Sequence, residues 1–226
     1  MTRAFAEILA IAAKRKGGLD AVERLLAETP SRPPKEIAAL ADDRILAEMT
    51  RRIFNAGFSS KVITAKWPAF ETAFWRFDPH ACAFMNAEQF DALLANREIV
   101  RNGAKIKAVQ ANANFILALA KEHGAAARFF ADWPDSDYVG LLDLLKKRGS
   151  HLGGDSGMRF LRAIGKPAFI ATKDVVAALI RDGVVTRAPS AKADFAAIQA
   201  AFNRWSKESG RDLTAISRIL AMSVGE

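Results

Sequence analysis

Residues 96–122 read NREIVRNGAKIKAVQANANFILALAKE, and this stretch decides the fold class. From Ala104 to Glu122 the apolar residues recur every three to four positions, which is the repeat of one face of an α-helix. The same spacing recurs through nearly the whole chain, and no β-branched run is long enough for a strand. The sequence therefore predicts an all-α fold. In this central helix the apolar face consists of Ile106, Val109, Ala113, Ile116, Leu117 and Ala120.

Further helices are predicted on both sides of this segment. Asn86 and Gln89 in NAEQFDALL have the spacing of a capping box, which marks a helix start. No repeat at a fixed period is present, and no linker is long enough to separate domains cleanly. The other predicted helices cover residues 5–16, 19–26, 35–56 with a dip near 40–43, 61–75 with a bend at Pro68, 136–148, 158–164, 173–181, 191–209 and 212–222.

Composition excludes several classes of protein. The chain has 226 residues, 50% of them apolar, so it can bury a core and is not expected to be disordered. The single Cys82 excludes a disulfide scaffold and indicates a reducing compartment. No apolar run approaches the roughly 20 residues that span a bilayer, and Glu7 interrupts the short apolar stretch at the N-terminus. We therefore expect a soluble, cytoplasmic protein with no membrane partner.

Positive charge is concentrated at two turns. Lys and Arg number 33 against 25 Asp and Glu, which gives a net charge of +8 and favours a polyanionic partner. The turn HLGGDSG, residues 151–157, lies between two predicted helices, and its glycines allow a close backbone approach to a phosphate. A helix-hairpin-helix grips a DNA backbone in this way, but an ordinary helix corner with solvated basic residues is an equal alternative on spacing alone. The basic residues around this turn are Lys146, Lys147, Arg148, Arg159 and Arg162.

The second basic turn contains Arg97, Arg101, Lys105 and Lys107, and a solvated surface is its alternative interpretation. A third cluster contains possible acid–base and stacking groups, although Glu48 and Arg52 could simply form a surface i,i+4 pair. Aromatic side chains at helical spacing usually pack in the core, so the same ambiguity applies to them. The three histidines are scattered, and no spacing suits a zinc site or a nucleophilic triad. The third cluster consists of Glu48, Arg52, Asn55, Phe58 and Ser60, followed by Trp67 and Trp75.

Three stretches resemble the bacterial 3-methyladenine DNA glycosylase I family, of the helix-hairpin-helix glycosylase superfamily. NAGFSS, residues 55–60, is similar to the family pattern Q-A-G-[LF]-S-W, and FWRFDP, residues 74–79, to F-x-x-F-D-P. IVRNGAKIKAVQANA, residues 99–113, is similar to I-[IV]-R-x-x-x-K-I-x-x-x-x-x-N-A, and the similarity resumes over residues 146–165. The resemblance implies one two-lobed domain over residues 1–226, with the hairpin at about 141–166, a base-binding cleft, and a segment 1–34 of open role.

The resemblance also shows departures. The family's base-contacting glutamate falls on Arg52, its stacking tryptophan falls on Ser60, and its zinc-binding Cys/His set has no counterpart, so we expect no metal and no cofactor. Glu48, one turn before Arg52, could replace the missing acid. The superfamily's catalytic aspartate falls near Thr172, and Asp174 is the nearest carboxylate, with a helix N-terminal position as its alternative role.

The function that the resemblance implies is base excision repair. We expect a DNA glycosylase that flips an alkylated, 3-methyladenine-type base from duplex DNA and hydrolyses its glycosidic bond. It would act as a monomer near the bacterial nucleoid, with damaged double-stranded DNA as its partner. The expected catalytic residues are Glu48 and Asp174, the base pocket is Arg52, Asn55, Phe58, Ser60 and Trp67, and the DNA contacts are Gly153, Gly154, Ser156, Gly157, Arg159, Arg101 and Lys105.

Two alternatives stay open. A cation at Arg52 should repel a positively charged methylated base, so the chain could be a catalytically inactive module of the same fold that binds damaged DNA. A weaker alternative is an all-α scaffold whose basic face binds another acidic partner.

Overall fold

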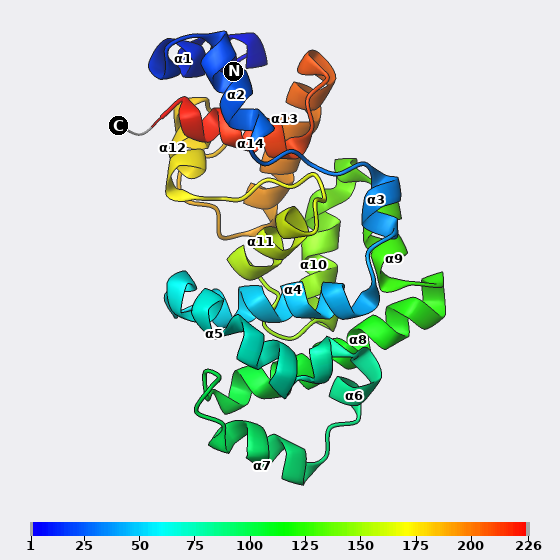
Figure 1. Cartoon of the computed structure of the whole chain (residues 1–226). Helices are drawn as coiled ribbons and strands as arrows, with labels where there is room; N and C mark the ends of the chain where they lie inside the picture. The colour runs from blue at the N-terminus through cyan, green and yellow to red at the C-terminus, as the bar shows by residue number, and fades with distance from the viewer. Residues whose placement is uncertain (1, 225–226) are drawn as a thin grey trace. The chain divides into compact units, whose positions relative to one another are not determined.

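The computed structural model describes residues 2–224, and all regular secondary structure in that range is helical (Figure 1). Fourteen α-helices and two short 3-10 helices are present there. The prediction of an all-α fold is therefore confirmed for the described part of the chain. None of these helices is both long and apolar enough to cross a membrane.

The chain divides into two compact units. Among the described residues, unit 1 consists of 2–32, 134–141 and 165–224, and unit 2 of 33–133 and 142–164. The helices of unit 1 are α1 (Phe5–Lys16), α2 (Leu19–Ala27), η2 (Asp135–Asp137), α12 (Lys173–Arg181), α13 (Lys192–Ser209) and α14 (Leu213–Met222), together with the start of α10 (Tyr138–Arg148).

Unit 2 contains the predicted central helix. The helices of this unit are α3 (Pro34–Ala38), α4 (Asp42–Asn55), α5 (Ser60–Ala73), η1 (Trp75–Phe77), α6 (Pro79–Ala83), α7 (Ala87–Ala95), α8 (Gly103–His123), α9 (Ala126–Asp132) and α11 (Asp155–Ala163), together with the end of α10.

The N-terminal segment, whose role the sequence left open, is part of the core of unit 1. Phe5, at the start of α1, is 2% exposed, and its backbone N–H donates to Glu208 at 2.9 Å. The indole of the fully buried Trp205 donates to the carbonyl of Arg3 at 3.0 Å. Because these contacts join α1 to α13, the segment is an integral part of unit 1.

In unit 2, α8 packs against α4, α6 and α9. Four residues of its predicted apolar face, Ile106, Val109, Ala113 and Ile116, are buried, whereas Leu117 and Ala120 are half-buried. Asn102 caps its N-terminus by accepting a hydrogen bond from the N–H of Lys105, and Gly124 ends it in the left-handed conformation, at φ +82°. The capping box of α7 is present with both of its hydrogen bonds, between Asn86 and Gln89. The start of α7 was therefore predicted correctly from its capping box, and the bounds of α8 lie within one residue of the predicted 104–122.

The helix predicted over residues 61–75 ends earlier, at Ala73, because a left-handed turn follows it. Trp75, Arg76 and Phe77 have φ angles of 50°, 56° and 61°, although none of them is glycine. The turn is held by the fully buried Phe77 and by the side chain of Arg44, which donates to the carbonyl of Arg76 at 2.7 Å. Tertiary contacts thus stabilise a conformation that these residue types rarely adopt.

Other differences concern short helices. The sequence analysis did not predict α6 or α9, which are five and seven residues long. Helix α11 begins at Asp155, three residues before the predicted start at Met158, because the glycine turn ends sooner than its composition suggested.

Candidate active site and nucleic-acid interface

The last two turns of α4 carry three of the predicted site residues on one face. Glu48, Arg52 and Asn55 follow one another at i, i+4 and i+7, so their side chains share that face. Asp42 and Asp43 lie in the first turn of α4, where the helix dipole favours acids, and Gly57 terminates the segment at φ +82°.

Glu48 and Arg52 form an ion pair. Nε of Arg52 donates to Oε1 of Glu48 at 2.6 Å, and Nη2 of Arg52 donates to the same oxygen. The two side chains are 22% and 26% exposed, so the pair is partly shielded from water. The positive charge that Arg52 places at the family's glutamate position is therefore largely balanced within one turn of helix.

Asn55, Phe58 and Ser60 continue from the end of this helix. The Oδ1 atom of Asn55 is buried and has no hydrogen-bond partner among the described residues, which leaves an acceptor unsatisfied. Phe58 lies in the turn between α4 and α5 and is 41% exposed. Ser60 is exposed as the first residue of α5. The end of α4 thus combines a carboxylate, an amide acceptor and an exposed aromatic ring.

Trp67 is placed differently. Its ring stacks with Phe70 and Phe77 at centroid distances of 5.6 and 5.3 Å, and the guanidinium of Arg51 lies 4.5 Å from its centroid. Its indole N–H donates to Glu71 at 3.0 Å. With its ring and its N–H engaged, Trp67 fits the core-packing alternative better than the predicted base pocket.

Lys105 is not the exposed phosphate-binding cation that the sequence predicted. Lys105 is only 9% exposed, and its Nζ donates to the carbonyl of Ile53 at 2.8 Å and also to the carbonyl of Ala56. The ammonium lies 4.7 Å from the ring centroid of Phe58. Burial lowers the pKa of Lys105. The side chain therefore caps the C-terminal carbonyls of α4, where a cation is favoured, and supports the turn that carries Phe58.

The other cations of the second basic turn are exposed. Arg97, Arg101 and Lys107 keep their charged groups at the surface of unit 2. Nζ of Lys66, on α5, donates to the carbonyls of Arg97 and Glu98 at 3.0 and 2.9 Å, which ties this turn to α5. The contacts of Lys105 with Ile53 and Ala56 also make the two predicted clusters, at residues 48–60 and 97–107, neighbours within unit 2.

The glycine turn between α10 and α11 is tightly built. A Cβ added to Gly157 would lie 2.4 Å from the carbonyl oxygen of the buried Leu152, so only glycine fits there. Gly154, at φ +57°, is the N-cap of α11, and Gly153 packs on the side chain of Lys146. The half-buried Ser156 lies in the first turn of α11.

The charged side chains next to the glycine turn are already partly paired. Arg159 is exposed and donates to Asp155 at 2.5 Å. Lys146, Lys147 and Arg148 are exposed at the end of α10. A compact turn with exposed cations on both sides suits a phosphate backbone, and its role in binding DNA stays a prediction.

Asn112 is a site residue that the sequence analysis did not predict. It lies on α8, is fully buried, and forms two hydrogen bonds with the backbone of Ser150. Its Nδ2 donates to the Ser150 carbonyl at 3.0 Å, and the Ser150 N–H donates to its Oδ1 at 2.8 Å. An asparagine on the otherwise apolar face of a helix was the available signal, since a buried amide needs polar partners.

Asp174 lies in unit 1, whereas Glu48 lies in unit 2. Asp174 is exposed in the first turn of α12, and Thr172 is the N-cap of that helix, accepting a hydrogen bond from Val175 at 3.3 Å. This placement suits the alternative role, in which the acid is favoured by the helix dipole. Its predicted catalytic role remains untested.

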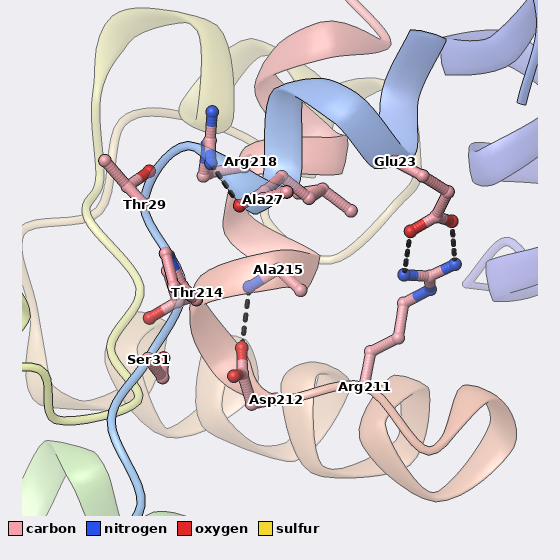
Figure 2. A pocket seen from close by; sticks show the side chains of 11 residues that line it. Glu23, Ala27, Thr29, Ser31, Arg211, Asp212, Thr214, Ala215 and Arg218 are labelled. Atoms are coloured by element: carbon pink, nitrogen blue, oxygen red, sulfur yellow. Dashed lines mark hydrogen bonds and ion pairs between the residues drawn. The ribbon is translucent and has the colours of Figure 1, made fainter. Parts of the chain in front are cut away.

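Unit 1 contains a cavity of about 300 Å³ between the segment 23–31 and the start of α14 (Figure 2). Its charged side chains already have partners within unit 1: Arg211 contacts both oxygens of Glu23, at 2.5 and 3.3 Å, and Asp212 caps α14 by accepting from the N–H of Ala215. Arg218 donates to the carbonyl of Leu26 at 2.9 Å. None of the predicted site residues lines this cavity, so it is separate from the candidate site.

Among residues 2–224, no group of three or more His, Cys, Asp or Glu side chains is placed to hold a metal ion. Cys82 is buried, its thiol contacts the carbonyl of Phe74 at 3.4 Å, and burial raises its pKa to about 12. Its side chain is therefore unsuited to act as a nucleophile.

Comparison with known proteins agrees with the motifs. The sequence model of the methyladenine glycosylase family matches residues 38–139. A DNA-3-methyladenine glycosylase of Haemophilus influenzae is 36% identical over 67 residues, which are 30% of this chain and 36% of that protein. The chain thus spans only about a third of the length of this curated relative.

Solved structures share the fold. The 3-methyladenine DNA glycosylase I of Staphylococcus aureus aligns with a TM-score of 0.51 at 23% identity, over 61% of this chain and 80% of that one. A variant 3-methyladenine DNA glycosylase I in complex with 3-methyladenine aligns with a TM-score of 0.50 at 22% identity, over 61% and 81%. The chain is therefore similar to the methyladenine glycosylase family over residues 38–139, and it shares the fold of these solved structures.

Proposed function

We propose that the protein is a DNA glycosylase that excises an alkylated, 3-methyladenine-type base from duplex DNA. One copy of the chain binds the duplex as a monomer. The observation that carries the proposal is the family match over residues 38–139, which includes α4, α5 and α8. These helices hold Glu48, Arg52, Asn55 and Phe58 together at the end of α4. The curated relative is named for the same activity.

In the proposed reaction the bond between C1′ of the sugar and the base nitrogen breaks, water adds to C1′, and the base leaves. An alkylated purine already carries positive charge and is a good leaving group, so the protein has chiefly to stabilise the charge that develops on the sugar. Glu48 is the candidate for this task. Both donors of Arg52 contact Oε1, which leaves Oε2 for the substrate.

Asn55 and Phe58 are the candidates for recognising the flipped base. The unsatisfied Oδ1 of Asn55 is an acceptor that an exocyclic amino group could satisfy. The exposed ring of Phe58 offers a flat apolar surface for stacking. Because Glu48 balances the charge of Arg52, the repulsion expected between Arg52 and a cationic base is reduced.

A second function is supported by the departures from the family pattern. Arg52 stands at the position of the family's glutamate, and Ser60 at that of its tryptophan. A protein of this kind could bind a lesion without excising it. This catalytically inactive module is the alternative proposal.

The test is to incubate the protein with methylated duplex DNA and with the same duplex unmethylated, and to measure released bases and abasic sites. Release of 3-methyladenine from the methylated duplex alone supports the glycosylase. Binding of the methylated duplex without release supports the inactive module. If the protein neither binds the methylated duplex nor releases bases from it, both proposals are contradicted.

A further inference from the structure

Asn112 links the segment that matches the family to the glycine turn outside it. The family match ends at residue 139, whereas Ser150 lies in the turn before α11. Asn112 is fully buried, and its amide group forms two hydrogen bonds with the Ser150 backbone, at 3.0 and 2.8 Å. One planar amide thus satisfies both a donor and an acceptor of the turn, which fixes the position and the orientation of its backbone.

A second contact joins α8 to the end of α10. Arg148 donates to both oxygens of Glu122 at 3.1 and 2.8 Å, and its guanidinium lies 5.3 Å from the ring centroid of Phe115. The hydrogen bonds from Arg148 lower the pKa of Glu122. This ion pair is exposed and contributes little, since exposed pairs are weak. The buried amide is therefore the stronger attachment.

The turn itself is stiff beyond this attachment. The side chain of Leu152 is fully buried, and Gly157 packs so closely against the Leu152 carbonyl that no Cβ fits. The turn is thus fixed at Ser150 and at Leu152, and Gly153 and Gly154 connect these points to α11. Binding to a backbone that is already fixed costs less conformational entropy than binding to a backbone that must first become ordered.

We propose that Asn112 is a positioning residue that holds the glycine turn, residues 149–154, in the conformation that binds the DNA backbone. The proposal rests on the proposed function, because it takes duplex DNA as the ligand of the turn. Asn112 itself contacts no DNA. It acts through Ser150, so its loss should weaken binding to all duplexes alike and leave the excision step unchanged.

The test compares Asn112→Asp with Asn114→Asp. The first variant keeps the acceptor for the Ser150 N–H but places a carboxylate oxygen against the Ser150 carbonyl. The second makes the same change of charge on the same helix, at an exposed residue whose amide donates only to the Gln110 carbonyl at 3.0 Å. Duplex affinity is measured with and without a methylated base, together with the rate of base release at saturating DNA.

For Asn112→Asp we expect duplex affinity to fall about tenfold on both DNAs, with the saturated release rate unchanged within about twofold. Hydrogen exchange at the Ser150 amide should be faster in this variant and unchanged in Asn114→Asp, which should bind as the wild type does. If Asn112→Asp does not fold, Asn112→Ala removes both hydrogen bonds without adding a charge and is measured in the same way.

The outcomes separate this proposal from the proposed function. Faster exchange at Ser150 with wild-type affinity would overturn the role of Asn112, as would an equal loss of affinity in Asn114→Asp. If the wild-type protein binds DNA without releasing bases, the proposed glycosylase activity is contradicted. The affinities of the Asn112→Asp and Asn114→Asp variants then still decide the proposed role of Asn112. A wild-type protein that binds no duplex would overturn both.

Discussion

Two turns of unit 2 are attached to the same helix, α8, by different chemistry. The turn at residues 56–59 is held by Lys105, whose ammonium donates to the carbonyls of Ile53 and Ala56. The glycine turn at residues 149–154 is held by Asn112, whose neutral amide pairs with the backbone of Ser150. The first attachment places a positive charge beside an aromatic ring at the candidate active site, and the second adds no charge.

The two turns also differ in what they share with the methyladenine glycosylase family. Around the first turn, the family's glutamate and tryptophan positions hold Arg52 and Ser60, whereas Lys105 matches the lysine of the family pattern. The glycine turn lies beyond the matched residues 38–139, but its backbone is fixed by α8, which lies within them. We propose that the two turns serve separate tasks, base excision at the first and DNA binding at the second, and the following variants test that separation.

The largest effect is expected for Glu48→Gln. This change removes the negative charge that we assign to stabilising the sugar cation, and it keeps an oxygen that can accept from Arg52. Base release should fall about 100- to 1,000-fold, the loss typical of removing one electrostatic contact to a transition state. Duplex affinity should stay nearly unchanged, because Glu48 lies in α4 and is not part of the glycine turn to which we assign DNA binding.

Single-turnover base release and duplex affinity are the two measurements for Glu48. The matched control is Glu88→Gln, an exposed glutamate in the first turn of α7, which should leave both quantities unchanged. Excision at the wild-type rate in Glu48→Gln would remove Glu48 from the mechanism and leave unit 2 without the acid that we propose.

The next effect is on stability, for Lys105→Met. Methionine fills similar space but cannot donate to the carbonyls of Ile53 and Ala56, so the last turn of α4 loses its cap. Hydrogen bonds to a charged group are worth about 1.5–3 kcal/mol each, but the variant also removes the cost of burying the charge of Lys105. We therefore expect the free energy of unfolding to fall by about 2–3 kcal/mol. Urea denaturation measures this quantity.

Lys107→Met is the control for Lys105, two residues further along α8. Its ammonium is exposed and lies 5.5 Å from the ring centroid of Phe90, a contact worth about 0.5 kcal/mol. Equal destabilisation by both variants would mean that Lys105 acts as a surface charge, the alternative interpretation of the sequence, and not as a helix cap.

These lysines illustrate what could be predicted from the sequence. The helical repeat gave the fold class, and the cap at Asn86 and the bounds of α12 were predicted correctly because they depend on neighbouring residues. The burial of Lys105 was not predictable in this way, since it depends on carbonyls about fifty residues earlier in the chain. The short helices α6 and α9 were missed because their lengths, five and seven residues, give too little periodicity.

The candidate site was predicted in part. Glu48, Arg52 and Asn55 share a face because of helical spacing alone, and the sequence placed them together. The pairing of Trp67 with Arg51 and the attachment of Ser150 by Asn112 are tertiary contacts that no local pattern encodes. The left-handed turn at Trp75–Phe77 was also missed, because residues other than glycine rarely adopt it without tertiary support.

A smaller loss of stability is expected for Gly157→Ala. The added Cβ would lie 2.4 Å from the Leu152 carbonyl oxygen, so the glycine turn must shift. Overpacking of this kind costs about 1–3 kcal/mol, and duplex affinity should fall with it. The control is Gly153→Ala, whose Cβ would meet only the flexible side chain of Lys146, at 3.4 Å. A stable Gly157→Ala variant that binds DNA normally would contradict the close packing on which the turn depends.

The smallest effect is expected for Arg159→Ala, which tests the glycine turn without disturbing its backbone. Arg159 is exposed on α11 and pairs only with Asp155 in the same helix, so its removal should hardly change stability. If its charge contacts a phosphate, duplex affinity should fall several-fold for all sequences, and the slope of log affinity against log salt should decrease by about 1. The saturated rate of base release should not change. A variant that keeps the wild-type salt slope would place the phosphate contacts elsewhere on unit 2, with the exposed Arg97 and Arg101 as the next cations to replace.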